Sequence, residues 1–145
     1  MRITDLEKTL GDFHMDIPKL YIETGKIHGI IGGNGCGKTT LCKLLMGILQ
    51  QDKGEIDWEG INQKRITMTA QRPYFIHASV YENICYPLKI RHEKPEEELV
   101  DWWLEQCGLI HKKHQYARSL SSGEQQKVSM IRALIFHPEF IMIDE

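Results

Sequence analysis

Short apolar runs separated by polar turns occupy the first half of the chain, a pattern that predicts strands. The runs cover residues 13–17, 20–23, 27–32, 54–58 and 65–70. The run at 27–32 leads directly into a glycine-rich turn, after which apolar residues repeat at helical spacing: Leu41, Leu44, Leu45 and Ile48. The first half therefore predicts short strands, one of which enters a helix through a glycine-rich loop.

The second half of the chain has a mainly helical pattern. The segment 95–106 begins with proline, carries glutamates in its first turn and is followed by Gly108, an order typical of a helix. Ser121 and Glu124 have the spacing of a capping box, which predicts the start of another helix. The last apolar run, 140–143, predicts a buried strand. The chain as a whole is therefore predicted to be α/β.

Composition narrows the class of protein. The chain has 145 residues, of which 41% are hydrophobic, and carries 18 lysines and arginines against 20 aspartates and glutamates. This profile is typical of one globular domain, or of part of a larger one, and gives no basic signal for nucleic acid. The mean hydropathy of −0.36, the lack of a long apolar run and an N-terminus unlike a signal peptide predict a cytoplasmic protein.

The glycine-rich segment 32–39 fits the pattern G-x-x-x-x-G-K-[ST] and lies between a predicted strand and a predicted helix. Such a loop turns backbone N–H groups toward a phosphate, its lysine adds a mobile cation, and the next residue supplies a hydroxyl for Mg²⁺. The candidate phosphate-binding residues are Gly32, Asn34, Gly35, Cys36, Gly37, Lys38, Thr39 and Thr40. The sequence thus predicts a nucleotide-phosphate site.

Asp144 and Glu145 directly follow the last apolar run. A carboxylate at the end of a buried strand can hold Mg²⁺, and a neighbouring carboxylate can polarise a water molecule. The pair alone is a weak signal, because buried strands commonly end in solvated acids. Because a phosphate loop precedes the pair in the sequence, Asp144 becomes a candidate magnesium ligand and Glu145 becomes a candidate general base.

Together with residues 120–127, these two motifs make the chain resemble the ATPase domain of ATP-binding-cassette (ABC) proteins over nearly its whole length. The family's signature begins Leu-Ser-Gly-Gly followed by Gln or Glu, and here it reads Leu120-Ser121-Ser122-Gly123-Glu124. Gln71 and the residues that follow it resemble the family's Q-loop. Four motifs in the family's order are far more specific than any one of them.

The resemblance implies a P-loop NTPase fold of ABC type, with an N-terminal antiparallel β subdomain and a helical signature subdomain. The implied boundaries are 1–77 for the β subdomain and P-loop core, 78–122 for the helical subdomain, and 123–145 for the signature helix and Walker B strand. The family continues beyond this point into a D-loop and a switch histidine, so the C-terminal part of the core sheet is expected to be missing. We therefore expect these residues alone to be unstable and to hydrolyse ATP poorly.

The resemblance also implies an ATP site shared between two copies. ATP with Mg²⁺ binds the Walker A loop of one copy, and the signature of the other closes over it through Ser121, Ser122, Gly123 and Glu124. Gln71 is expected to sense Mg²⁺ and the attacking water, and Glu145 to act as general base. The magnesium ligands implied are Thr39, Gln71 and Asp144.

Three residues depart from the family pattern: Ser122, Gly33 and Cys36. Ser122 replaces a glycine, and its side chain can crowd the approach of a phosphate. Cys36 suggests the hypothesis that thiol oxidation beside the phosphates alters nucleotide binding. The family's adenine-stacking aromatic residue has no assigned counterpart, since the nearest candidate, Phe13, alternates with apolar residues in a way that favours the core.

Within the family, the stand-alone cassette and short N-terminal region resemble the ATP-driving subunits of bacterial importers. The implied partners are a second copy of the domain, a transmembrane permease that docks at residues 73–88, and an extracytoplasmic solute-binding protein, with no nucleic acid. The implied location is the cytoplasmic face of the membrane. The stretch 71–88 resembles tungstate or molybdate systems, although the membrane partner and binding protein select the substrate.

Two alternatives stay open. One is a soluble ABC ATPase that acts on DNA or ribosomes, but no heptad run lies between Lys38 and Ser121, and there is no second cassette with a basic linker. The other is a truncated, non-catalytic remnant that binds nucleotide weakly or not at all. Co-purification with a membrane protein would favour the importer, and salt-sensitive binding to RNA would favour the soluble ATPase. Absence of nucleotide binding would favour the remnant.

Overall fold

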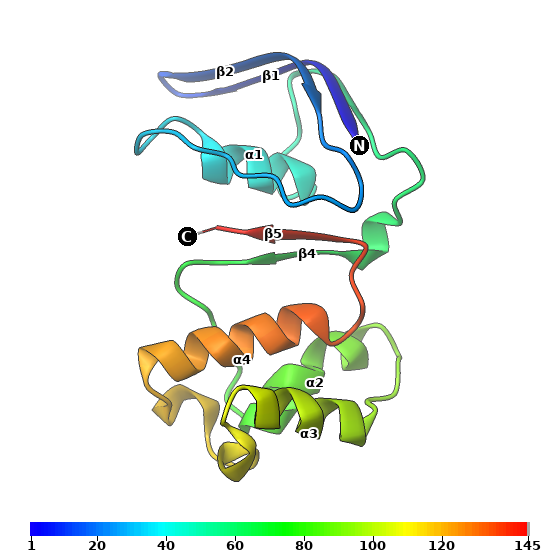
Figure 1. The fold of residues 1–145 in the computed structure, drawn as a ribbon. Helices are drawn as coiled ribbons and strands as arrows, with labels where there is room; N and C mark the ends of the chain where they lie inside the picture. The colour runs from blue at the N-terminus through cyan, green and yellow to red at the C-terminus, as the bar shows by residue number, and fades with distance from the viewer. Residues whose placement is uncertain (145) are drawn as a thin grey trace. The chain divides into compact units, whose positions relative to one another are not determined.

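The computed structural model describes residues 1–144, which form two compact units. The first unit consists of Met1–Ile66 together with Asp144, and the second of Thr67–Ile143. Figure 1 shows the helices and strands of both units. The expected β-rich and helical parts of the chain are therefore both present.

A three-stranded antiparallel sheet forms most of the first unit, in the order β2-β1-β3. Its strands are β1 (Arg2–Leu10), β2 (Phe13–Tyr21) and β3 (Lys53–Asp57). β1 and β2 form a hairpin through Gly11, whose φ of +58° suits a tight turn. The two short strands predicted between residues 13 and 23 are thus one continuous strand, and β1 is an element that the sequence pattern does not predict.

A β-bulge at Asp5 explains why buried and exposed residues do not alternate regularly along β1. Asp5 has a φ of +49°, and the pairing of β1 with β3 shifts register after Thr4. The buried side chains of the strand, Ile3 and Leu6, are therefore three positions apart rather than two. Gly54 approaches this bulge so closely that a Cβ there would lie 2.2 Å from the carbonyl oxygen of Asp5, so only glycine fits.

The strand predicted at 27–32 is wrong, because the chain there forms neither strand nor helix. Ile27 and Ile31 are almost completely exposed. A strand needs a neighbour that pairs its backbone N–H and C=O groups, and within residues 1–144 no strand pairs with this segment. The apolar run alone is therefore not enough to form the strand.

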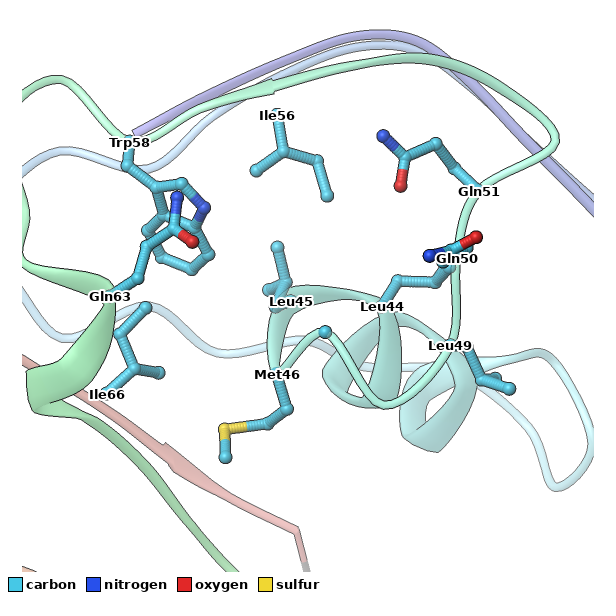
Figure 2. A pocket seen from close by; sticks show the side chains of 11 residues that line it. Leu44, Leu45, Met46, Leu49, Gln50, Gln51, Ile56, Trp58, Gln63 and Ile66 are labelled. Atoms are coloured by element: carbon cyan, nitrogen blue, oxygen red, sulfur yellow. The ribbon is translucent and has the colours of Figure 1, made fainter.

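Helix α1 (Lys38–Leu45) follows the glycine-rich loop as predicted, and it buries Leu41, Leu44 and Leu45. A cavity of about 360 Å³ lies beside the C-terminal end of this helix. Figure 2 shows the apolar side chains that line it, among them Ile56 and Trp58, together with the amide groups of Gln50, Gln51 and Gln63. Gln63 belongs to a short 3₁₀ helix, η1 (Gln63–Arg65).

The second unit combines a two-stranded sheet with a group of helices. Strands β4 (Ile66–Thr69) and β5 (Phe140–Ile143) pair with each other and confirm the last two predicted strands. The helices are α2 (Val80–Ile90), α3 (Glu97–Gln106) and α4 (Ser122–Leu134), with the 3₁₀ helices η2 (Ile110–Lys112) and η3 (Ala117–Ser119) before α4. Within residues 1–144, no helix is long and apolar enough to cross a membrane.

The hydrophobic core of the second unit lies among its helices, where α2 packs against α4 (Figure 1). The largest fully buried side chains include Ile84, Leu104, Ile131 and Phe136. Trp103 packs partly against this core, whereas Trp102 is half exposed, and the two rings meet edge to face at 4.9 Å between centroids. Of this tryptophan pair, Trp103 therefore contributes to the core.

A buried asparagine fixes the turn that leads into α2. The Asn83 side chain is completely buried and donates hydrogen bonds to the carbonyl oxygens of Ile76, Ala78 and Ser79. Ser79 then begins the helix through a capping box with Glu82. Because one buried side chain bonds to several backbone groups of this turn, it holds the chain in place at the start of α2.

Candidate nucleotide site

The ammonium group of Lys38 contacts the glycine-rich loop of the first unit. Lys38 Nζ donates hydrogen bonds to the carbonyl oxygens of Gly32, at 2.7 Å, and Gly33, at 3.0 Å. It also lies 3.7 Å from the sulfur of Cys36. Because Lys38 is the first residue of α1, the cation sits at the helix end whose free N–H groups attract anions.

Gly37 joins this loop to the antiparallel sheet. Its φ of +101° is a left-handed conformation that other residues rarely adopt. A Cβ at this position would lie 2.6 Å from Cζ of Phe13 and 2.7 Å from Cε of Met15. The side chains of β2 therefore pack directly against the loop. Phe13, the nearest candidate for stacking on adenine, is used at least partly in this contact.

Thr39 and Asp144 lie together in the first unit, although they are far apart in the sequence. Thr39 Oγ1 donates a hydrogen bond to Asp144 Oδ2 at 2.9 Å. A hydroxyl and a carboxylate are the oxygen donors that Mg²⁺ prefers, so these two residues fit a magnesium ion. Burial and the nearby Asp144 carboxylate raise the pKa of the Cys42 thiol.

The predicted capping box at the signature is confirmed. Ser121 is the N-cap of α4, and its backbone N–H and hydroxyl donate to Glu124 Oε2 at 3.0 and 2.9 Å. Ser121, Ser122 and Gly123 are exposed, so the start of this helix is open to solvent. Its free N–H groups are therefore available to an anionic group from outside the unit.

The other carboxylate oxygen of Glu124 has a partner that the sequence analysis misses. Lys112 Nζ lies 2.5 Å from Glu124 Oε1. Hydrogen bonds from Lys112 and from the N–H and hydroxyl of Ser121 lower the pKa of Glu124 to about 2. The pattern of residues around 112 carries no signal for this contact, because it depends on how η2 folds back toward α4.

Gln71 is exposed and lies two residues beyond the end of β4. The segment after it is tied to the signature region by two arginines. Arg118 donates to the carbonyl oxygen of Phe75 from Nε at 2.9 Å and from Nη2 at 2.7 Å. Arg132 on α4 donates to the carbonyl oxygen of Tyr74 at 2.7 Å. These contacts across long sequence separations are also absent from the sequence analysis.

The predicted site residues fall into three groups. The phosphate loop, Thr39 and Asp144 come together in the first unit. Gln71 and the signature belong to the second unit, and their catalytic roles stay predictions. Glu145, the predicted general base, lies outside the described residues.

A sequence model of the ABC transporter family matches residues 15–145. The tungstate uptake system ATP-binding protein of Peptoclostridium acidaminophilum is 36% identical over 99% of this chain and 70% of its own length. The spermidine/putrescine import ATP-binding protein of Nitrosomonas europaea is 33% identical over all of this chain and 43% of its own length. The sulfate/thiosulfate import ATP-binding protein of Bordetella pertussis is 30% identical, with 45% of its length covered. These relatives agree with the importer interpretation.

Solved structures show the same fold. CbiO1 of Clostridium perfringens, part of the ABC transporter complex cbiONQ, has a TM-score of 0.81 and 27% identity. This chain spans 64% of that structure, as it spans only part of its curated relatives. The sequence match and the shared fold lead to the same conclusion: the chain belongs to the ABC transporter family.

Proposed function

We propose that the chain is the ATP-hydrolysing subunit of a bacterial importer, in which two copies close head to tail on ATP and drive a separate permease. ATPase activity is the activity of this family. The observation that carries the proposal is the hydrogen bond of 2.9 Å between Thr39 and Asp144. It brings the two halves of a nucleotide-phosphate site, the P-loop and the acidic end of a strand, into contact.

In this proposal the phosphates of ATP bind to the loop N–H groups and to the start of α1. The Lys38 ammonium leaves the carbonyl oxygens of Gly32 and Gly33 and pairs with phosphate oxygens instead. Thr39, Asp144 and Gln71 would hold Mg²⁺, which supplies positive charge beside the phosphates. Glu145 would accept a proton from the attacking water.

The exposed signature would bind the nucleotide of the second copy. Three features support this role: the open N-terminus of α4, the exposed Ser121 hydroxyl and the exposed backbone of Gly123. A helix N-terminus attracts anions because its first N–H groups have no partner within the helix. The site would therefore be complete only between two copies, and hydrolysis would depend on their association.

The permease would dock at residues 73–88, at the cytoplasmic face of the membrane. The aromatic residues of this segment differ in exposure, so some belong to the core and others are available to a partner. Phe75 is buried and Tyr81 packs against the core, whereas Tyr74 is 74% exposed and Tyr86 41% exposed. The two exposed tyrosines are therefore the proposed contacts, because amphipathic aromatic rings contribute strongly to protein interfaces.

For the transported substrate we propose an oxyanion such as tungstate. Two observations support this class: the resemblance of residues 71–88 to tungstate and molybdate systems, and the 36% identity to a tungstate uptake protein. In such importers the solute-binding protein and permease contact the substrate. The test is whether the purified complex with its permease shows ATPase activity that rises with a tungstate-loaded binding protein and not with a spermidine-loaded one.

The first test of the proposal is calorimetric titration of the chain with Mg-ATP. We expect saturable binding that Lys38→Ala weakens by about tenfold or more, because a charge-assisted bond to phosphate is lost. Lys43→Ala is the matched control, since this exposed lysine lies near the other end of the same helix. Equal affinities of the two variants would contradict the proposed phosphate site, and absence of binding in the unmodified chain would favour the non-catalytic remnant.

A further inference from the structure

The start of the signature helix carries a negative charge close to the group that would receive a phosphate. Glu124 lies in the first turn of α4, and its Oε2 accepts the hydroxyl of Ser121 at 2.9 Å and the N–H of Ser121 at 3.0 Å. The low pKa of Glu124, about 2, keeps the carboxylate ionised at neutral pH. A phosphate that approaches Ser121 therefore approaches a carboxylate as well.

This arrangement opposes anion binding in two ways. The carboxylate repels the charge of a nucleotide phosphate, and it also accepts the only proton that the Ser121 hydroxyl can donate. The free N–H groups of the helix attract the phosphate, but an acidic side chain in the first turn already uses part of that attraction. An unopposed Glu124 would thus weaken the signature as a receptor for phosphate.

Lys112 supplies the opposing charge. Its Nζ lies 2.5 Å from Glu124 Oε1, on the oxygen that Ser121 does not use. Both side chains are partly exposed, at 25% and 26%, so solvent screens the pair in part. The carboxylate is consequently both neutralised and held in one orientation.

The neighbouring lysine does not perform the same task. Lys113 Nζ pairs with Glu97 and Asp101 of α3, at 2.8 and 2.6 Å, and these bonds raise its pKa to about 12. The two adjacent lysines therefore face different elements, and only Lys112 reaches α4. Removing Lys112 would leave Glu124 without the cation that now contacts it.

We propose that Lys112 is a positioning residue for nucleotide-driven closure, and that its ammonium neutralises Glu124 so that Ser121 and the start of α4 can accept a phosphate from the second copy. The inference rests on the proposed function, because it assumes closure between two copies. Lys112 acts only through Glu124 and touches neither nucleotide nor metal. It follows that the charge of Lys112 matters only while residue 124 is acidic.

The test is ATP-dependent self-association of the full chain, followed by sedimentation velocity over a range of Mg-ATP concentrations. We expect Lys112→Gln to raise the ATP concentration at half-association by about two- to fivefold, as expected for a partly exposed ion pair. Lys112→Arg keeps the charge and should restore the unmodified value. Lys127→Gln, which removes an exposed lysine of α4 that bonds to the carbonyl oxygen of Cys107 and not to Glu124, is the control and should leave the association curve unchanged.

A second pair of variants separates charge neutralisation from a merely structural role. Lys112→Gln should have no further effect when it is added to Glu124→Gln, because the charge that it offsets is then gone. An equal effect of Lys112→Gln in both backgrounds would overturn the inference. The inference would also be overturned if the unmodified chain associates and Lys112→Gln gives the same association curve.

The two proposals fail in different ways. If the unmodified chain binds Mg-ATP but never associates, the proposed closure between copies is overturned, and the inference about Lys112 is overturned with it. If the unmodified chain associates and Lys112→Gln follows the same curve, only the inference is overturned. Circular dichroism of each variant checks that the helix content of the chain is retained, and Lys112→Arg supplies a charged variant of nearly the same size.

Discussion

Gly37 shows how a single residue connects the phosphate loop to the rest of its unit. Its left-handed φ of +101° and its contact with Phe13 and Met15 each exclude a side chain. Either requirement alone would favour glycine, and a larger residue must both strain the loop and displace the ends of these two side chains. The G-x-x-x-x-G-K-[ST] pattern predicts a glycine here, but only the structure shows the second reason for it.

Gly37→Ala is therefore expected to destabilise the chain by about 1–3 kcal/mol, from backbone strain and steric overlap. Gly33→Ala is the matched change in the same loop, because nothing lies within 4 Å of its Cβ position and its φ is not left-handed. We expect Gly33→Ala to change stability by less than about 0.5 kcal/mol. Urea unfolding of both variants measures the difference, and equal unfolding midpoints would contradict this account of Gly37.

The low pKa of Glu124 predicts how the stability of the chain depends on pH. Its pKa is lowered to about 2 from the usual 4.5, so its bonds to Lys112 and Ser121 contribute stability that is fully present above pH 4.5. This contribution is lost as the pH falls through about 2. In Lys112→Gln the pKa of Glu124 should rise toward 4.5, which carbon-13 NMR of the carboxyl group can follow. An unchanged pKa would show that Lys112 does not hold the carboxylate in solution.

At the scale of elements, the contacts that arginines of η3 and α4 make with the segment after Gln71 are the most informative. Arg118 and Arg132 bind the carbonyl oxygens of Phe75 and Tyr74, and their guanidinium groups lie over the rings of Tyr74 and Phe75 at 5.3 and 5.0 Å. The proposed permease contact, Tyr74, is thereby connected to the signature helix. A shift of either one would be transmitted to the other through these bonds.

Arg118→Ala is expected to loosen the chain between β4 and α2, since two strong hydrogen bonds to Phe75 are lost. Hydrogen exchange of the amides at residues 74–78 should become at least about tenfold faster, which corresponds to about 1.4 kcal/mol of local stability. Exchange within α3 should not change. Arg72→Ala, at an exposed position of the same segment, serves as the control and should leave the exchange of residues 74–78 as it was.

Elements whose signals are local could be predicted from the sequence, and elements that depend on distant partners could not. The capping box of Ser121 and Glu124 and the loop before α1 are encoded within a few residues, and both are confirmed. The strand at 27–32 was predicted from its apolar run, but a strand exists only beside a neighbour, and none pairs with it within residues 1–144. β1 was missed because the bulge at Asp5 breaks its alternation.

The candidate site likewise contains residues that sequence patterns predict and residues that they do not. The phosphate loop and the pair Asp144 and Glu145 follow recognisable patterns, and Thr39 lies in hydrogen-bond contact with Asp144, whereas Glu145 lies outside the described residues. Lys112 lies twelve residues before Glu124 in a run of polar residues, and no spacing rule connects it to a capping box. Contacts of this kind depend on the path of the intervening chain, which single-sequence patterns do not describe.

At the scale of the whole molecule, Ile27 and Ile31 are the most exposed apolar side chains described. They lie in an extended apolar run of low charge, which is the kind of segment that promotes self-association through strand pairing. Ile27→Ser with Ile31→Ser should therefore reduce light scattering of concentrated solutions. The melting temperature should change little, because these side chains bury almost no surface. Unchanged scattering would mean that this segment is not the contact responsible.

The three tryptophans are divided between the two compact units. Trp58 lines the cavity beside the end of α1 in the first unit (Figure 2), whereas Trp102 and Trp103 meet edge to face in the second. Intrinsic fluorescence therefore carries a separate reporter for each unit. The tryptophan emission of a chain with Trp102→Phe and Trp103→Phe would come only from the first unit, and its spectrum would report events at α1 without an extrinsic dye.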